Sequence, residues 1–485
     1  MVRRTLTVTL AALVLGATMP ASALANDLRI ETGAVERTAG STSLRVTAKV
    51  SWKNAWRNAR NYDAVWLFAK IHVAPNGSWR HARLTAGSKS ATAAITCEPS
   101  ADRVGMFCRA TATHRGDLAG DVVLEVDPTS LPENMRSSPS LEARVLGIEM
   151  VYVPDGPFSV GDKDTASVSH AALYKSNAAG EHDGPYRITS EAAIRVAPEV
   201  GALYYHATYP QYEGDRAGPI PAEFPKGTRA FYIMKYEVLQ GQYADFLNMI
   251  GHYPASFRSP LGGIEYAAER GSIRIEGGAY VASKPSRPAN QMSWDDGTAF
   301  ADWAGLRPMT ELEFTKAARG PVEPVASDYP WGTSSKAGLL RRVGPDDDLA
   351  QTGAADESRL ADGTREALGA SYWWVMDLAG SVWEKAVTIG HARGRAFRGT
   401  HGDGTLRDYG LATNDDWPLG DNEAGGYGYR GGGYYERERE RTRDPAVREL
   451  NPYSPVEWRN YGSWGGGPRG VAYGFRAVRT ADPAR

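Results

Sequence analysis

Hydrophobic and polar residues alternate over residues 44–52 and again over residues 65–71. A period of two places one set of side chains on a single face, so both stretches predict half-buried β-strands. The dipeptide Asn76-Gly77 predicts a two-residue hairpin turn after the second strand, and another strand is expected over residues 121–126. Because no helical pattern intervenes, residues 26–140 are predicted to form a small antiparallel β-sandwich.

Several tryptophans fall within or beside these strands, and two roles are open to them. They could form an aromatic platform that binds sugars, or they could fill the core of the sandwich. The second role is the more common one for tryptophans in such domains, and we favour it. The residues concerned are Trp52, Trp56, Trp66 and Trp79.

A helical period replaces the alternation after a strand that is expected over residues 231–238. Three helices are predicted from apolar spacing and from capping residues at their ends. The first has apolar side chains at positions 243, 246, 247 and 250 and ends at Gly251, the second is capped by Ser293 with Asp296, and the third has a capping box of Thr310 and Glu313 and ends at Gly320.

The length of 485 residues is enough for two or three domains. A segment rich in proline and serine over residues 128–140 is typical of a linker. A second domain is expected over residues 145–485, with a polar insertion at about residues 164–226. The 53 glycines and 29 prolines favour loops over long helices in this domain.

The first residues have the features of an export signal. Arg3 and Arg4 precede the apolar run Leu6–Leu15, and small residues before Asn26 give a cleavage site. The alternative is a membrane anchor, but the apolar run is too short to span a bilayer. We therefore expect residues 1–25 to be a signal peptide and the mature protein to be periplasmic or extracellular, with no membrane span.

The charge balance indicates no affinity for nucleic acid. Lysine and arginine number 55 against 57 aspartate and glutamate residues, so no net field attracts polyanions.

Cys97 and Cys108 are the two cysteines of the chain. In an oxidising compartment such a pair predicts a disulfide, whereas a redox-active pair is disfavoured by the ten residues between them.

The stretch from Met376 to Glu384 contains two carboxylates and a glycine that permits a turn. Calcium binds six to eight oxygens from carboxylates, carbonyls and water, so Asp377 and Glu384 are candidate ligands. The alternative is a buried strand and turn, with both acids solvated and Trp383 in the core.

This stretch resembles the Gly-Asn-Val-Trp-Glu signature of the formylglycine-generating enzymes, also called sulfatase-modifying factors. Further segments agree with that family in order and spacing, namely residues 150–158, 232–243, 288–320 and 473–479. The resemblance implies an α+β fold for residues 145–485, a loop-rich variant of the C-type lectin fold. It also implies a structural calcium held by Asp377, Gly380, Val382 and Glu384, where Asp377 replaces the usual asparagine.

The catalytic chemistry of that family does not transfer with the resemblance. Formylglycine-generating enzymes oxidise a substrate cysteine with copper and oxygen, using two cysteines that follow a Gly-Gly-Ser segment. The matching segment here is Gly431–Gly433, and the two thiol positions fall at Glu436 and Arg441. Neither residue is a ligand for Cu(I), so copper is not expected.

Two other branches of the superfamily bear on the question of activity. One forms sulfoxides with non-haem iron held by histidines of a helical domain, whereas the first domain here is predicted to be β. His391 and His401 lack a carboxylate at a suitable spacing, so they are weak evidence for an iron site. Whether the protein binds iron is not decided by the sequence. A cysteine-independent branch, which includes relatives in pyoverdine maturation, keeps an oxidoreductase as the alternative function.

The C-terminal region combines aromatic residues with arginine and glycine, a mixture that occurs in ligand-binding surfaces. The candidate surface consists of Tyr434, Tyr435, Trp458, Tyr461 and Trp464. We therefore expect a non-catalytic, calcium-binding protein that binds a ligand or takes part in surface assembly. Its partner would be a protein, a peptide or a glycan.

A short theme recurs in the same region as Phe397-Arg398, Tyr429-Arg430 and Phe475-Arg476. In a strand, neighbouring side chains point to opposite faces, so the aromatic ring would enter the core and the arginine would face away from it. We interpret the theme as a structural repeat within the fold.

Overall fold

The computed structural model describes residues 25–37, 44–263, 266–267, 270–339, 357–420, 425–433, 452–464 and 469–483. Within these ranges no helix combines the length and the apolar character needed to cross a membrane. The following predicted features lie outside the described residues: the signal peptide up to residue 24, the candidate ligand residues Tyr434 and Tyr435, and the two thiol positions Glu436 and Arg441.

One sheet of the N-terminal region has the strand order β1-β2-β8-β5. These strands are β1 (Arg29–Arg37), β2 (Leu44–Arg57), β5 (Lys89–Ser90) and β8 (His114–Val126). Along β2 buried and exposed side chains alternate from Leu44 to Trp52, which confirms the predicted half-buried strand. Its inward side chains pack on a second sheet, and the two sheets enclose an apolar core.

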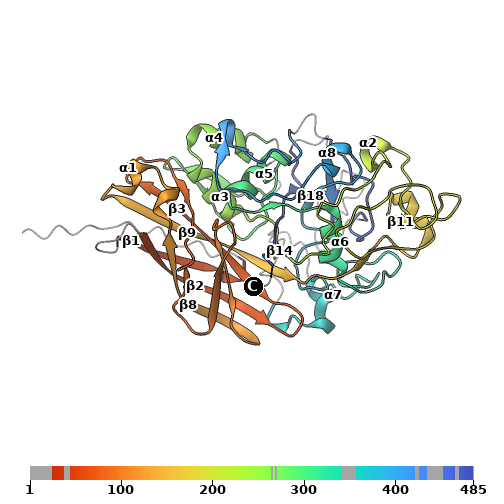
Figure 1. Ribbon diagram of the computed structural model, residues 1–485, viewed down its shortest axis with the longest axis horizontal. Helices are drawn as coiled ribbons and strands as arrows, with labels where there is room; N and C mark the ends of the chain where they lie inside the picture. The colour runs from red at the N-terminus through yellow and green to blue at the C-terminus, as the bar shows by residue number, and fades with distance from the viewer. Residues whose placement is uncertain are drawn as a thin grey trace, which may run out of the picture.

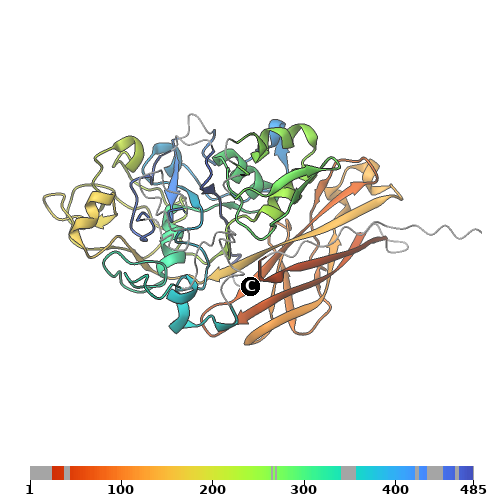
Figure 2. The same ribbon diagram turned by 180° about the vertical axis from the view of Figure 1, so that it is seen from behind.

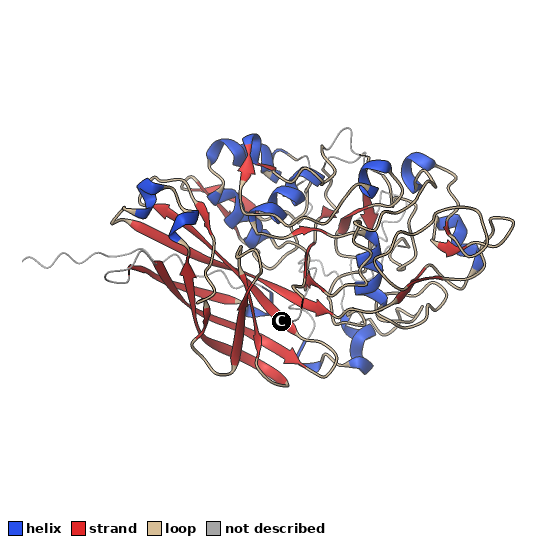
Figure 3. Cartoon of the chain, viewed as in Figure 1, coloured by secondary structure: helices blue, strands red, loops and turns tan. Residues whose placement is uncertain are grey.

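The second sheet is larger and has the order β17-β23-β14-β9-β3-β7-β6, with β4 paired to β3. Its strands are β3 (Asp63–Val73), β4 (Arg80–Ala82), β6 (Ile95–Pro99), β7 (Met106–Ala110), β9 (Leu141–Val153), β14 (Phe231–Met234), β17 (Arg307–Pro308) and β23 (Ala477–Thr480). Strand β9 pairs with β3 on one side and with β14 on the other. The two predicted domains therefore share one sheet, which Figures 1 and 3 show as strands running from the sandwich into the loop-rich region.

Strand β3 is buried on both faces, whereas the alternation predicted a half-buried strand. Val65 and Leu67 pack in the core of the sandwich, and Trp66 and Phe68 pack in the core of the C-terminal region. The half-buried prediction is wrong because a second layer covers the face that would otherwise meet solvent.

The tryptophans of the first region serve as core residues. Trp52, Trp56 and Trp66 are 1–2% exposed or fully buried. Trp79 is half-buried and stacks on His72 with 3.9 Å between ring centroids. The core interpretation is confirmed, but not for the sandwich alone: Trp52 packs in the core of the sandwich, whereas Trp56 and Trp66 pack with residues of the C-terminal region.

The predicted hairpin after β3 is present, but its turn is longer than two residues. Strand β4 pairs with β3 in a register that places Ile71 opposite Arg80. Residues 74–79 therefore form the loop, and the amide of Gly77 donates to the carbonyl of Val73 at 2.7 Å. Pairing at this register, rather than the Asn-Gly dipeptide, determines the length of the connection.

The three predicted helices are α3 (Gln240–Met249), α5 (Trp294–Trp303) and α6 (Glu311–Arg319). Ser293 and Thr310 cap α5 and α6 through the predicted reciprocal hydrogen bonds with Asp296 and Glu313. The strand expected over residues 231–238 ends at Met234, as β14.

The remaining elements are short and are joined by long loops (Figure 2). The linker contains α1 (Glu133–Arg136), and β10 (Phe158–Val160) precedes the insertion. The insertion itself contains β11 (Tyr174–Lys175), β12 (Tyr186–Ile188), β13 (Leu203–Tyr204) and α2 (Pro210–Glu213). The C-terminal region adds α4 (His252–Arg258), β15 (Ile273–Glu276), β16 (Ala279–Ala282), α7 (Arg365–Leu368), β18 (Trp383–Val387), α8 (Ala392–Arg395), β19 (Leu406–Arg407), β20 (Leu411–Ala412), β21 (Tyr427–Arg430) and β22 (Tyr473–Gly474).

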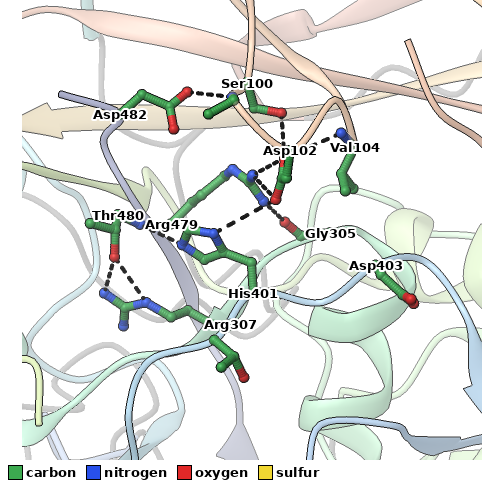
Figure 4. Close-up of polar contacts among 12 residues, drawn as sticks. Ser100, Asp102, Val104, Gly305, Arg307, His401, Asp403, Arg479, Thr480 and Asp482 are labelled. Carbon is green, nitrogen blue, oxygen red and sulfur yellow. Dashed lines mark hydrogen bonds and ion pairs between the residues drawn. The ribbon is translucent and has the colours of Figure 1, made fainter. Parts of the chain in front are cut away.

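Polar contacts also join the two regions. The indole of Trp66 donates to the carbonyl of Ala304 at 2.8 Å, and the amine of Lys70 donates to the carbonyl of Trp303 at 2.7 Å. Arg479 of β23 forms an ion pair with Asp102 of the first region at 2.5 Å (Figure 4). Through these contacts and the shared sheet, the sandwich and the C-terminal region form a single packed unit.

Candidate functional site

The predicted calcium-binding stretch is a compact turn that leads into β18. Asp377, Gly380 and Ser381 have φ values of 67°, 78° and 63°, a conformation that favours glycine and occasionally aspartate. The amide of Gly380 donates to the carbonyl of Gly431 at 2.8 Å. The turn is therefore held against the end of β21, beside the Gly431–Gly433 segment.

Strand β18 is the central strand of a small sheet with the order β21-β18-β22. Glu384 stands opposite Arg430 of β21 and Gly474 of β22. This position buries Glu384 completely, whereas the alternative considered from the sequence was a solvated acid. Asp377 is likewise only 1% exposed.

Arg476 supplies a positive charge to Glu384. Its Nε and Nη2 atoms donate to Oε1 of Glu384 at 2.8 and 2.6 Å. Burial, together with the nearby charge of Glu237, raises the pKa of Glu384 to about 7 against the opposing effect of Arg476. The second oxygen, Oε2, is buried and has no hydrogen-bond partner among the described residues.

Of the predicted calcium ligands, Glu384 has one oxygen, Oε2, that could bind a cation, while its other oxygen, Oε1, already accepts hydrogen bonds from Arg476. The described residues bring no three histidine, cysteine, aspartate or glutamate side chains close enough to hold a metal ion. A calcium here would therefore depend on backbone carbonyls, as expected for Gly380 and Val382, together with Asp377 and Oε2 of Glu384. Calcium at these four residues stays a prediction.

Aromatic rings cluster around Trp383 at the start of β18. Trp458 and Tyr461 lie 5.7 and 5.8 Å from it between ring centroids, and Trp464 lies 5.4 Å from Tyr461. A Cβ atom on Gly433 would come within 2.7 Å of the Trp383 ring. Glycine at position 433 thus permits the backbone to pass close to the indole.

The members of this cluster differ in exposure. Trp458 is 4% exposed, so its ring supports the cluster and is not part of a surface, which corrects its place in the candidate ligand surface. Tyr461 and Trp464 are half-buried. Tyr212, from α2 in the insertion, joins them at 6.5 and 6.0 Å.

The cysteines lie at a different place in the molecule. Cys97 of β6 and Cys108 of β7 are directly opposite each other and form a disulfide, which confirms the predicted bond. Because the chain contains two cysteines and both are in this bond, it has no free thiol.

The candidate histidines are not gathered into a site. His391 caps the short helix α8 by accepting from the amide of Arg393 at 3.1 Å. His401 accepts a hydrogen bond from the amide of Thr480 at 3.1 Å, next to Arg479 and Asp102 (Figure 4).

The structure contains a buried ionic cluster that sequence reasoning did not find. Glu311, the first residue of α6, accepts from Arg459 at 2.6 and 3.1 Å and from Arg430 at 3.3 Å. Although burial alone would raise it, the pKa of Glu311 is lowered by these two arginines. The signal was a carboxylate at a capped helix N-terminus, a favoured position for negative charge.

This cluster also shows where two arginines of the recurring aromatic-arginine theme lie. Tyr429 and Phe475 are buried as expected, but Arg430 and Arg476 are buried as well. Each finds a carboxylate inside the fold, Glu311 and Glu384 respectively. Only Arg398, of the three arginines, is exposed.

Comparison with known proteins agrees with this architecture. Residues 137–481 match the Sulfatase-modifying factor enzyme 1-like domain, the FGE-sulfatase family. The chain belongs to this family. The matched region begins just before β9 and ends after β23, so it includes β9 and β14 of the shared sheet but not β3.

Individual relatives are distant and match over limited stretches. The chain is 27% identical over 201 residues to a formylglycine-generating enzyme of Streptomyces coelicolor, which covers 35% of the chain and 63% of the relative. It is 28% identical over 166 residues to a hercynine oxygenase of Mycobacterium tuberculosis (32% and 37%). It is 30% identical over 110 residues to the inactive C-alpha-formylglycine-generating enzyme 2 of Bos taurus (22% and 35%). The chain thus spans less than two thirds of each of these relatives.

Proposed function

We propose that this protein is an exported, non-catalytic member of the family that binds a peptide or a glycan, with a structural calcium in a domain of C-type lectin type. The observation that carries the proposal is the Cys97–Cys108 disulfide. It uses both cysteines of the chain, so a thiolate pair for Cu(I) cannot form in the family domain. A relative whose name describes it as inactive provides a precedent.

The proposed ligand surface is the half-buried portion of the aromatic cluster, formed by Tyr212, Tyr461 and Trp464. Trp458 and Trp383 support these rings from inside the fold. Rigid aromatic side chains give large contact areas at a small loss of conformational entropy, and the adjoining glycines allow a ligand to approach the backbone.

The test is binding of the full chain to peptide and glycan arrays, followed by titration of the hits. Trp464→Ala and Tyr461→Ala should weaken binding by at least about tenfold, because aromatic anchors dominate such interfaces. Tyr253→Ala is the matched control, since Tyr253 is 61% exposed on α4, outside the cluster. Ligand binding that is equally strong in all three variants would contradict the proposed surface.

An oxidoreductase that does not depend on cysteine is the second candidate function. Similarity to a hercynine oxygenase over 166 residues favours it. Metal analysis of the purified protein separates the two candidates. Calcium without a redox metal supports the binding protein, whereas iron or copper at one equivalent per chain would favour the enzyme.

A further inference from the structure

A pocket of about 530 Å³ opens where the end of the insertion meets the edge of the shared sheet. One wall is the segment that leads into β14, the second is the loop after α8, and the floor lies at the ends of β17 and β23. Its lining includes Glu223, Arg229, Arg307, Arg398, His401 and Thr480. The aromatic cluster contributes none of these residues.

The floor of the pocket contains an ion pair between Arg307 and Glu313, whose charges cancel. Arg307 donates to both carboxylate oxygens of Glu313, at 2.9 and 2.6 Å, and both side chains are almost fully buried. Arg307 also donates to the hydroxyl oxygen of Thr480 at 2.9 Å. This leaves the hydroxyl proton of Thr480 as a donor to the pocket.

The carboxylate of Glu191 also has its hydrogen-bond partners within the protein, in this case backbone amides. Its carboxylate accepts from the amides of Lys226 and Thr228, both at 2.7 Å, and from the amide of Arg229 at 3.0 Å. Although burial alone would raise it, the pKa of Glu191 is lowered by these hydrogen bonds. Glu191 therefore holds the wall in place, and its charge is offset by three N–H groups.

His401 adds no positive charge to the lining. Burial, together with the charges of Arg479 and Arg307, holds the pKa of its imidazole well below the usual range. Nε2 accepts from the amide of Thr480, so the proton of the neutral ring lies on Nδ1, on the side of Asp102 (Figure 4).

Arg229 and Arg398 remain as the cations available to a ligand. Both side chains are exposed, and their backbone amides donate to Glu191 and Asp416. Their guanidinium groups form no hydrogen bond or ion pair with any residue that the structure describes. Two arginines from different walls thus line one pocket with their donors unused.

We propose that this pocket binds a small organic carboxylate through Arg229 and Arg398. The planar guanidinium group matches a carboxylate in bidentate geometry, and the volume lies in the range of small-molecule sites. Pro225, which is half-buried, supplies apolar surface for the body of the ligand, and Thr480 supplies a neutral donor. Glu223 also lines the pocket, and its negative charge favours a monoanion over a polyanion.

The test is calorimetric titration of the full chain with D-glucuronate, acetate and inorganic phosphate, with D-glucose as the uncharged control. The expected result is saturable binding of D-glucuronate with a Kd of about 1 mM or tighter, and no binding of D-glucose. Arg229→Gln and Arg398→Gln should each raise the Kd by about tenfold, which corresponds to the loss of one charge-assisted contact.

Two further variants make the test specific. Arg407→Gln removes an exposed arginine of β19 outside the pocket and should leave the Kd unchanged. Glu223→Gln should lower the Kd, because it removes a like charge. The proposal is overturned if none of the carboxylates saturates, if phosphate alone binds, or if the Arg229 and Arg398 variants bind as tightly as the Arg407 variant. Trp464→Ala should leave the Kd for carboxylates unchanged, which separates this site from the proposed ligand surface.

Discussion

Glu384 and Arg476 form an ion pair inside the family domain, with both side chains 0% exposed and 2.6 Å between Nη2 and Oε1. Arg476 also donates to the carbonyls of Met234 and Met376. One guanidinium thus joins β14, the turn before β18 and β18 itself. Glu384, which the family resemblance assigned to calcium, is therefore part of a buried ion pair that connects these three elements.

Breaking this pair should be costly. Arg476→Met leaves the Glu384 carboxylate buried without a positive partner, so the free energy of unfolding should fall by about 3–5 kcal/mol. The double variant Arg476→Met/Glu384→Leu should regain part of the loss, since it removes one of the two buried carboxylates that face Arg476, while Glu237, 3.7 Å from the guanidinium, remains. Denaturant unfolding measures both values. Arg195→Ala is the control, because its pair with Glu199 is exposed and should contribute less than about 1 kcal/mol.

Stability should decrease as the pH rises through a window set by Glu149. This residue is 5% exposed near Lys235 and Glu357, and burial raises the pKa of its carboxyl from 4.5 to about 8. Between these values the folded protein binds one proton more than the unfolded chain, so raising the pH favours unfolding.

The melting temperature should therefore fall from about pH 5 to about pH 8, and Glu149→Gln should reduce this fall. Glu199→Gln, at an exposed position, should not change the pH dependence. Identical slopes for wild type and the Glu149 variant would show that other groups cause the dependence.

The sandwich and the family domain should not fold as separate fragments. A fragment of residues 26–140 lacks β9, which pairs along the whole length of β3, and a fragment of residues 145–485 lacks β3 itself. Calorimetry of the full chain should show one cooperative transition, and circular dichroism of either fragment should show none. Independent, cooperative melting of a fragment would contradict this.

Removal of the disulfide should destabilise the whole protein. Cys97 and Cys108 are separated by 11 positions, and closing so short a loop contributes about 3 kcal/mol in the chain-entropy model. Because β7 pairs with β3 in the shared sheet, the Cys97→Ser/Cys108→Ser variant should shift the single transition of the chain. Two separate transitions, with only one of them shifted, would show that the sandwich melts independently.

Calcium should stabilise the folded protein if the predicted ligands hold it. At a hundredfold excess over the dissociation constant the gain is about 2.7 kcal/mol, because only the folded state presents Asp377, Glu384 and the carbonyls of Gly380 and Val382 together. Chelation should lower the melting temperature, and Asp377→Ala should abolish the difference. Equal melting curves with chelator and with added calcium would rule out this site.

Local features of this protein were determined by the sequence itself. The alternation in β2, the capping boxes of α5 and α6, and the pairing of Cys97 with Cys108 depend on neighbours a few positions away. The segments that resemble the family could also be recognised from the sequence, because short motifs in a constant order need no three-dimensional information. These features are local, and a periodic pattern or a short spacing contains the physical cause.

The tertiary structure decided everything that depends on distant partners. The burial of both faces of β3 follows from its packing between two layers, and no pattern within residues 65–71 could indicate the second layer. The partner of Glu384 lies 92 positions away, and that of Arg479 lies 377 positions away. Arg229 and Arg398 meet at one pocket because β14, β17 and β23 converge there. Buried pairs such as Glu384 and Arg476 form only when folding brings distant residues together and removes the water between them.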